Sequence, residues 1–370
     1  MTVLHSNIQM SQRTKQPTPS GENSGVMQRL VRPSTAEDLP SILELFVSSG
    51  LRPNIAPPEL EWKYWQPRGD WPGPRSLVLA DGEELLAHGA LIPGRCAWST
   101  HRIGIVHVID WAARASAVGA GVALMRHIGR ATPALLAIGG SAQTQQILPF
   151  IGFRDLGCIT GYVRTLHPLR LLRAAAVPTA RRLPRVARSI VWKLAAPARG
   201  SAGWQTRALE RGEVEAVAAV LPAPVRGMAI IERSVELFRY MLSCPVVPLR
   251  LFAVEKSDRT RGYFLLAAAP GQVRIADCWM DSDDPADWRA MILCAVERAK
   301  QDPQAAEVVI WANDPLLAGT LIECGFHARH QIGMRLRARD AAASPPLPLR
   351  VQMLDSDAAF LHAGIADYWA

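Results

Sequence analysis

The stretch ASAVGAGVALM, residues Ala115 to Met125, holds two glycines separated by one residue. A strand-like run, HRIGIVHVIDW, ends shortly before it, and the apolar residues that follow Gly121 recur at helical spacing. A glycine pair at such a strand-to-helix turn has two interpretations. It can cradle a phosphate group, or it can form a tight turn in which small residues pack against the strand.

The physics of a helix start is consistent with the cradle. The first backbone N–H groups of a helix have no partner within it and carry partial positive charge, so they suit a pyrophosphate. Gly119 and Gly121 let a phosphate approach the backbone with no Cβ in the way. The amides of Val118 and Ala120 complete the turn, and the Ser116 hydroxyl adds a donor.

Two other phosphate-binding motifs do not fit this stretch. A Rossmann fingerprint would place a third glycine at position 124, which is Leu124. A Walker loop needs Gly-Lys followed by Ser or Thr, which is absent. Arg114 and Arg126 flank the stretch and are candidates for an added positive charge near a bound phosphate.

The segments around the stretch alternate between strand and helix patterns. In chain order we expect a strand at 30–31, helices at 36–46 and 57–65, a hairpin of strands 76–80 and 85–92, a strand at 101–111, a helix at 121–128, a strand at 134–140, and a helix at 142–150. The second half repeats this order: Asp277 follows Asp110 by 167 residues, and Gly325 follows Gly152 by 173 residues. Because 370 residues are long for one core, two copies of one α/β unit are predicted.

At this point the chain resembles a known family, the GNAT acyltransferases, whose fold binds acetyl-CoA. The opening VRPSTAEDLPSILELF is similar to the family's first strand and helix, and the family's cofactor signature falls on residues 116–121, with Ser116 in place of its leading Gln or Arg. The family's helix ending in Gly-Phe is matched at Gly152-Phe153 and again at Gly325-Phe326. The resemblance covers residues 28–157 and, more weakly, 204–338.

The resemblance implies an α/β fold of two tandem GNAT-like domains, each a mixed, mostly antiparallel sheet flanked by helices. We expect a disordered tail at 1–27, an N-terminal acyl-CoA-binding domain at 28–166, a basic linker at 167–203, a degenerate C-terminal GNAT-like domain at 204–340, and an extension at 341–370. The region of the second copy that corresponds to the cradle reads DSDDPADWRAM, with four aspartates and no glycine. Carboxylates at a helix start satisfy its dipole and repel a pyrophosphate, so this copy is expected to bind no CoA.

The resemblance also implies where the chemistry occurs. In the family the acyl thioester lies beside the strand that precedes the cradle, which here places the backbone of Ile109 and Trp111 near the acyl carbonyl. His107 and Asp110 are the titratable groups of the segment GIVHVIDW, and alternation puts them on opposite faces. His107 has the unperturbed pKa of a general base, and its alternative role is a hydrogen-bonded core histidine. Asp110 is a second catalytic candidate, or it caps the loop or binds an arginine.

Glu61, His88 and His101 are weaker candidates, because nothing in the sequence directs them at the thioester. The family often places a tyrosine four residues before its Gly-Phe to protonate the leaving thiolate. That position is Leu148 in the first copy and Leu321 in the second. The aromatic cluster that starts at Trp62 is either a groove for a sugar or acyl chain or, the interpretation we favour, the core packing of a helix.

Composition limits the class of protein. The net charge of +8 and the pI near 9.5 favour anionic partners without choosing among phosphates, nucleic acid and lipid. The six cysteines include no CxxC or Cys/His pair at metal-ligand spacing, so we expect free thiols and no metal site. No run approaches the roughly 18 apolar residues of a membrane span, and the N-terminus has no apolar signal core. We therefore expect a cytoplasmic protein without a transmembrane segment.

The segment from Arg164 to Arg199 holds nine Arg or Lys and no Asp or Glu. Its four prolines are predicted to break it into short amphipathic pieces. A solvated connector is the first hypothesis for it. Peripheral contact with an anionic membrane surface is the second, since leucines, Ile190, Val191 and Trp192 accompany the charge. Nucleic-acid contact ranks last, because no recognised module accompanies the segment.

The function implied is an acyl-CoA-dependent N- or O-acyltransferase. Its cofactor is acetyl-CoA or another acyl-CoA, and its acceptor is an amine or hydroxyl of an unidentified small molecule or glycan. An aminoacyl or peptidyl transferase that uses charged tRNA on a duplicated GNAT fold is an alternative, which the basic linker favours and the intact cradle opposes. A non-catalytic scaffold is another, which the missing tyrosine and Ser116 favour.

Overall fold

The computed structural model describes residues 29–51, 57–173, 179–197, 203–225, 227–340, 345 and 348–361. The predicted tail at 1–27 lies outside the described residues, as do parts of the predicted linker and C-terminal extension. The first half of the chain supplies, in order, β1 (Leu30–Pro33), the 3₁₀ turn η1 (Ala36–Asp38), α1 (Leu39–Ser48), α2 (Pro57–Tyr64), β2 (Ser76–Asp81), β3 (Glu84–Trp98), β4 (His101–Ala113), α3 (Ala120–Ala131), β5 (Ala134–Ile138), α4 (Ala142–Ile147), η2 (Leu148–Ile151) and β6 (Arg154–Thr165).

The second half follows a basic segment that contains η3 (Pro168–Arg173) and α5 (Thr179–Ala195). It supplies β7 (Trp204–Leu209), η4 (Val214–Val220), β8 (Ala229–Ile231), α6 (Val235–Met241), β9 (Leu249–Lys256), β10 (Arg259–Ala269), β11 (Gln272–Met280), α7 (Pro285–Ala299), β12 (Glu307–Ala312), α8 (Pro315–Glu323), β13 (His327–Ala338), β14 (Leu349–Arg350), η5 (Met353–Asp355) and η6 (Asp357–Ala359). The predicted order of strands and helices is confirmed. The prediction that prolines break up the basic segment is wrong at Pro184, because α5 runs through this residue.

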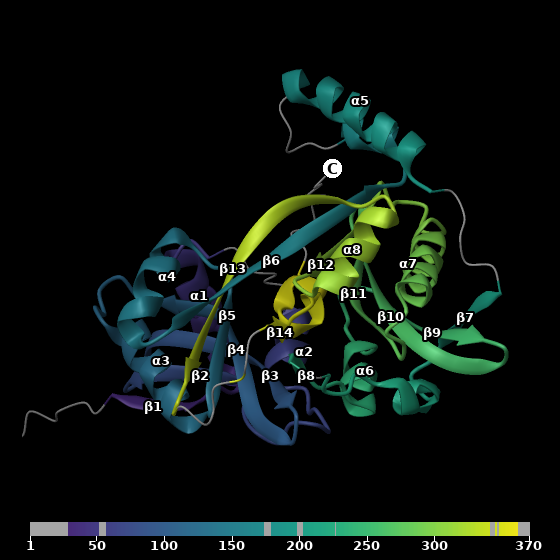
Figure 1. Ribbon diagram of the computed structural model, residues 1–370. Helices are drawn as coiled ribbons and strands as arrows, with labels where there is room; N and C mark the ends of the chain where they lie inside the picture. Colours follow the sequence, from purple (N-terminus) through teal and green to yellow (C-terminus); the bar gives the residue numbers. More distant parts are fainter. Residues whose placement is uncertain are drawn as a thin grey trace, which may run out of the picture.

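One sheet runs through both halves, in the order β1-β2-β3-β4-β5-β13-β6-β12-β11-β10-β9-β7. β4 and β5 are parallel, as are β11 and β12, whereas most other neighbours are antiparallel. The halves exchange their last strands: β13 lies between β5 and β6, and β6 pairs with β12. Figure 1 shows β6 and β13 crossing the middle of the molecule side by side. The two predicted domains therefore share one sheet and do not form two separate ones.

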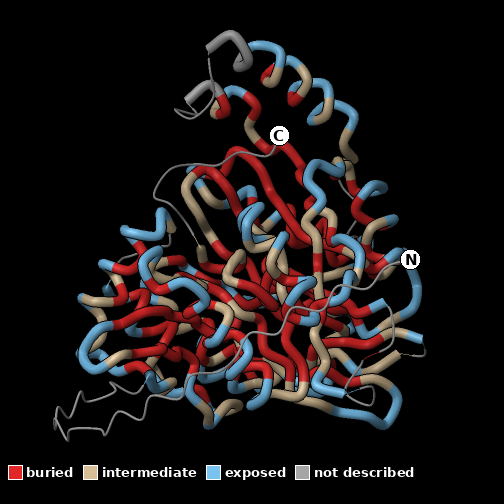
Figure 2. The backbone as a smooth tube through the Cα atoms, turned by 90° about the vertical axis from the view of Figure 1, so that its left-hand side faces the viewer, coloured by how far each residue is buried: buried red, intermediate tan, exposed pale blue. Residues whose placement is uncertain are grey.

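Helices cover this sheet where its side chains are apolar. α3 packs on β2, β3 and β4, whereas α1 and α2 cover the opposite face of the same strands. In the second half, Trp288 and Met291 of α7 are fully buried beside β10 and β11. The largest apolar cluster joins residues of both halves, among them Ile105 and Tyr263, and Figure 2 shows the buried backbone as a continuous band.

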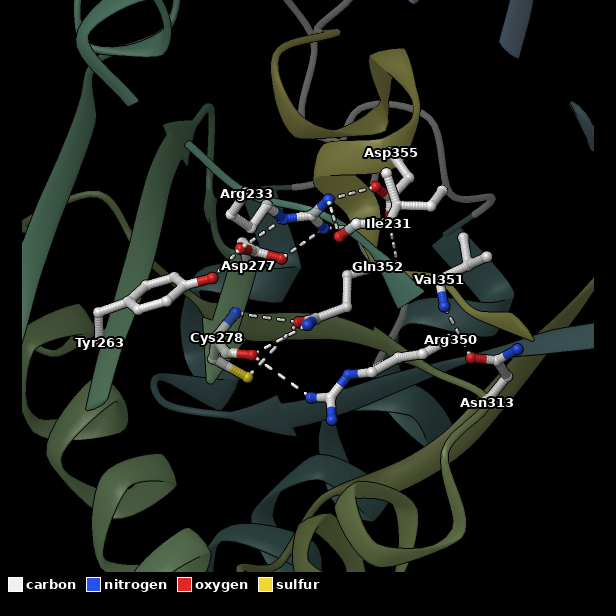
Figure 3. Close-up of polar contacts among 10 residues, drawn as sticks. All are labelled: Ile231, Arg233, Tyr263, Asp277, Cys278, Asn313, Arg350, Val351, Gln352 and Asp355. Atoms are coloured by element: carbon white, nitrogen blue, oxygen red, sulfur yellow. Dashed lines mark hydrogen bonds and ion pairs between the residues drawn. The ribbon is translucent and has the colours of Figure 1, made fainter. Parts of the chain in front are cut away.

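The C-terminal segment lies between the two halves. β14 pairs with β8, which in turn pairs with β3. The side-chain amide of Gln352 bonds to the backbone N–H and C=O of Cys278 in β11 (Figure 3). Arg350 pairs with Asp314 at 2.9 Å. This segment has little regular secondary structure, so side-chain hydrogen bonds take the place of the backbone hydrogen bonds of a β-sheet.

Arg233 joins this segment to the sheet. Its guanidinium donates to both carboxylate oxygens of Asp277, at 2.8 and 2.9 Å, and to Asp355 at 2.6 and 3.1 Å (Figure 3). The Tyr263 hydroxyl donates to Asp277 at 2.7 Å. All four side chains are buried. Burial raises the pKa of the Asp355 carboxyl and Asp277 adds to this effect, although Arg233 opposes it.

Candidate functional site

A β-bulge interrupts β4 next to the glycine turn. Asp110 and Trp111 lie opposite the single residue Gly89 of β3, because the register shifts by one at this point. Asp110 has a φ of +48°, which is uncommon for a residue with a side chain. Such a backbone persists only where the surroundings hold it in place, and it often marks a functional site.

The bulge corrects the predicted alternation along this strand. Alternation places Asp110 on the face of Val106 and Val108, which pack under α3. Instead, the Asp110 carboxylate contacts Tyr64 of α2, on the face where Ile109 joins the α1–α2 core. The reason is that an extra residue in a strand resets the side-chain period of two.

Three buried groups hold the bulge. Lys63 Nζ lies 2.6 Å from the Asp110 carboxylate, and the Tyr64 hydroxyl donates to the same oxygen at 2.7 Å. His88 Nδ1 donates to the Asp110 carbonyl at 3.0 Å, while Ser76 Oγ lies 2.9 Å from His88 Nε2. Burial alone would raise the pKa of Asp110, but Lys63 and the Tyr64 hydroxyl lower it. Burial lowers the pKa of His88 to about 4, so it is neutral near pH 7.

β4 and β5 separate immediately after His107. The pair His107–Leu136 is the last in their register, so the edge of β4 from residue 108 onward has no partner on β5. His107 Nδ1 lies 3.0 Å from the Leu136 carbonyl, which can only accept, so this nitrogen carries the proton. Nε2 then keeps its lone pair, and burial lowers the pKa of His107 to about 4. The histidine is therefore a neutral acceptor near pH 7.

The predicted cradle forms the start of α3. Gly119 is the N-cap with φ +82°, and no atom lies within 4 Å of where its Cβ would stand. Val118 is 91% exposed and Ser116 is exposed. The Ala120 amide bonds to the Ala117 carbonyl at 3.0 Å, but within the described residues the amides of positions 118, 119, 121 and 122 have no protein acceptor. These amides remain available to an anion.

Trp111 fixes the other glycine. Its Nε1 donates to the Gly121 carbonyl at 3.0 Å, and a Cβ on Gly121 would lie 3.2 Å from the same nitrogen. A side chain at position 121 would therefore crowd Trp111 and Ala113, so glycine suits the strand–helix packing as well as an open turn. Arg114 does not face the turn, because Glu44, Glu84 and the Leu85 carbonyl hold its guanidinium. Arg126 is exposed two turns along α3.

A cavity of about 660 Å³ borders His107 and Leu136, the last paired residues of β4 and β5. It is lined by His107 and Leu136, by β3, by α6, and by the segments 62–75 and 354–360. Trp62 and Tyr240 stack in its wall with ring centroids 4.6 Å apart, which joins α2 of the first half to α6 of the second. The predicted core role of the aromatic cluster is confirmed for Trp62 and Tyr64, which are each 2% exposed.

Arg75 is a buried cation in this wall. Its guanidinium donates to the Tyr240 hydroxyl and to the carbonyls of Trp62 and Gln66. Arg68 beside it pairs with Asp70 at 2.6 Å, whereas within the described part of the chain Arg75 forms no ion pair with a carboxylate. Burial lowers the pKa of Arg75 from its ordinary high value, and the residue stays charged near pH 7.

The corresponding helix start in the second half is closed. The Asp284 carboxylate caps α7 by accepting from the Ala286 amide at 2.9 Å, and Asp287 accepts from Ser282 at 2.8 Å. Leu148 and Leu321, at the positions where a tyrosine would supply an acid, are both buried in apolar clusters. Neither half therefore offers a side-chain acid at that position.

Sequence reasoning missed the groups that the tertiary structure brings to this site. Lys63 and Arg75 lie on segments without a recognised motif, and Arg233 lies in the other half of the chain. The available signal was indirect: Lys63 stands between the aromatic residues Trp62 and Tyr64, which are buried with it. Among the described residues no cluster of three His, Cys, Asp or Glu side chains could hold a metal ion. No described helix has the length and apolar character needed to cross a bilayer.

Comparison with known proteins gives likeness of fold without likeness of sequence. No family model and no curated protein matches the chain. Crystal structures of GCN5-related N-acetyltransferases from Anabaena variabilis and Kribbella flavida match with TM-scores of 0.56 and 0.51, at 12% and 15% identity. A probable N-acyltransferase from Enterococcus faecalis, described as a conserved protein of unknown function, matches with 0.54 at 10% identity. Each match covers 85% of this chain and 73–74% of the other, so the fold is shared along most of both chains.

Proposed function

We propose that this chain, which shares the fold of GCN5-related N-acetyltransferases, transfers an acyl group from acyl-CoA to an amine or hydroxyl of a small molecule. One observation carries the proposal. A single strand, β4, leads from His107 at the cavity, through the bulge at Asp110, to the open helix start at Gly119. We take the helix start as the donor site and the cavity as the acceptor site, with the unpaired edge of β4 between them.

The residues at the helix start fit a CoA pyrophosphate. The open amides of Val118, Gly119 and Gly121 would hold it, whereas the Ala120 amide is bonded to the Ala117 carbonyl, and Gly119 leaves the approach open. Ser116 would add a hydroxyl donor, whereas Arg114 is held elsewhere. When bound, acyl-CoA supplies an activated thioester, and its acyl group passes to the nitrogen or oxygen of the acceptor.

The chain's own residues supply position and proton transfer. We assign His107 Nε2 the role of general base, because His107 lines the cavity and its proton lies on Nδ1, which leaves a lone pair on Nε2. The backbone from Ile109 to Trp111, displaced by the bulge, would stabilise the acyl oxygen. Asp110 is a positioning residue: its carboxylate is committed to Lys63 and Tyr64 and holds the bulge. With Leu148 at the position of the acid, solvent would protonate the leaving thiolate.

The proposed role of the second half follows from the strand exchange. β13 fills the place beside β5, and α6 and the C-terminal segment close the acceptor cavity. We propose that the second half arose by duplication of the first and lost the cradle when Asp284 capped α7. It would then act as the acceptor-side half of one active unit.

The test is release of free CoA thiol from acetyl-CoA in the presence of an amine and alcohol panel. At least one acceptor class is expected to raise the release rate 100-fold or more over water, since proximity alone contributes effects of that order. The same assay with longer acyl-CoAs tests which acyl chain lengths the donor pocket accepts. Absence of transfer with every donor and acceptor, together with absence of acyl-CoA binding, would leave a non-catalytic fold.

Replacing His107 by Gln should lower kcat roughly 100-fold or more while the Kd of acetyl-CoA stays unchanged, because a general base contributes a factor of about 10² to 10⁴ to the rate.

In the wild type, the acid limb of the pH profile of kcat/KM should lie near pH 4 and not near 6.5, because the neutral form of His107 persists down to its lowered pKa of about 4. Below that pH the ring takes up a proton and the rate falls. His101→Gln, an exposed change on the same strand, is the matched control. An unchanged rate in His107→Gln contradicts the base role.

Arg75 predicts the charge of the acceptor. An acceptor that carries a carboxylate or phosphate would pair with this buried guanidinium, so Arg75→Gln is expected to raise the acceptor KM about tenfold or more. Uncharged acceptors should lose far less, and the Kd of acetyl-CoA should not change. Equal loss for charged and uncharged acceptors would show that Arg75 only supports Tyr240.

A further inference from the structure

Helix α5 carries an apolar stripe that faces away from the protein. Its members are Leu183, Ala187, Ile190, Val191 and Leu194. At 100° per residue they fall within an arc of about 100° on the helix. All are exposed, and Leu183, Val191 and Leu194 are 72%, 63% and 80% exposed. Figure 1 shows α5 at the periphery of the molecule.

The opposite face of α5 is the one that packs on the body. Val186 is 6% exposed and Ser189 is fully buried. Trp192 stacks on His327 of β13 with ring centroids 3.9 Å apart, and Arg188 lies over the same indole at 4.7 Å. The helix is therefore already fixed through its inner face, and the apolar stripe has no role in that packing.

The surroundings of the stripe are positive. Burial lowers the pKa of His327, and the charges that lower it further are Arg188 and Arg329. Burial lowers the pKa of His167 too, with Arg170, Lys193 and Lys300 adding to the effect. For both histidines every contributing charge is a cation, which agrees with the absence of any Asp or Glu from 164 to 199.

We propose that α5 docks the protein on the surface of an anionic lipid bilayer. The apolar stripe would enter the boundary between headgroups and acyl chains, while the flanking cations meet lipid phosphates. Charge complementarity favours an anionic bilayer as the binding partner of the stripe. A protein groove would have to be apolar and also bordered by acidic side chains, whereas an anionic bilayer has an apolar interior and negative headgroups along its whole surface. Lys193, which is exposed, lies on one flank of the stripe.

The experiment is co-sedimentation of the full chain with vesicles of phosphatidylcholine alone or with 30 mol% phosphatidylglycerol. We expect about tenfold stronger partition to the anionic vesicles, weakened by added salt. The double variant Val191→Glu/Leu194→Glu should lose this binding, and Lys193→Gln should weaken it about fivefold. The matched control is Val47→Glu/Phe150→Glu, which places the same charges at residues that are 72% and 85% exposed elsewhere.

Three results would overturn the proposal. One is equal or absent binding to both kinds of vesicle. Another is equal loss of binding in the stripe variant and the control variant. The third is a dimer in solution that Val191→Glu/Leu194→Glu dissociates, since a second copy would then cover the stripe. Circular dichroism of each variant checks that the fold is retained, so that lost binding reports on the surface.

Discussion

Gly119→Glu is expected to lower the affinity for acetyl-CoA by about 100-fold or more, which corresponds to about 2.7 kcal/mol. The new carboxylate would stand beside the open amides of Val118, Gly119 and Gly121, where it would repel a pyrophosphate and itself satisfy the helix dipole. Asp284 already does this at the start of α7. Isothermal titration calorimetry with acetyl-CoA measures the change directly.

Backbone strain must be separated from this effect, because position 119 has a φ of +82°. A side chain in the left-handed region costs about 1–2 kcal/mol of stability by itself. Gly157→Glu is the matched control: it has a φ of +84°, equal open space and the same new charge, far along the chain from the helix start. Gly119→Ala adds the strain without the charge and should retain most binding. If Gly119→Glu leaves the Kd of acetyl-CoA unchanged, the turn at Gly119 is not the donor site.

Arg233→Met is expected to lower the free energy of unfolding by about 3–5 kcal/mol at pH 7.5, because it leaves the Asp277 and Asp355 carboxylates buried without their cation. The loss should shrink as the pH falls toward 5. The folded variant would take up a proton that the unfolded chain does not hold, since the pKa of Asp355 is already raised by burial, and stability then rises as pH falls. Urea unfolding at both pH values measures this change.

The control for Arg233 is Arg102→Met. Arg102 pairs with Glu232 at 2.7 Å but is 53% exposed, so its loss should cost less than about 1 kcal/mol at either pH. If Arg233→Met does not fold, Arg233→Lys keeps one cation and should show an intermediate loss. The combination of Arg233→Met with Asp277→Asn and Asp355→Asn should recover part of the stability. A loss below 1 kcal/mol, or one independent of pH, would contradict this account of the cluster.

Local sequence determined most of the elements and the open turn. Periodicity placed the strands and helices from residue 76 to residue 153, and the glycines of ASAVGAGVALM predicted the helix start at Gly119. These features depend only on residues that are neighbours in the sequence. The periodicity of apolar side chains, the preference of certain residues for turns and the absence of a Cβ in glycine are all local properties. For the same reason the acids before α7 predicted a self-capped helix start.

Only the tertiary structure decided the rest. The exchange of β6 and β13 depends on pairing between strands more than 140 residues apart, and the local sequence pattern of a strand is satisfied by either partner. The bulge at Asp110 reversed the predicted face because one extra residue, held by Lys63, Tyr64 and His88, resets a period of two. The outward direction of the α5 stripe likewise emerged only when Trp192 fixed the inner face against His327. The sequence specifies which faces of the helices and strands are apolar. Which segment packs against each face is decided by contacts between residues that are far apart in the sequence, and local patterns do not reveal those contacts.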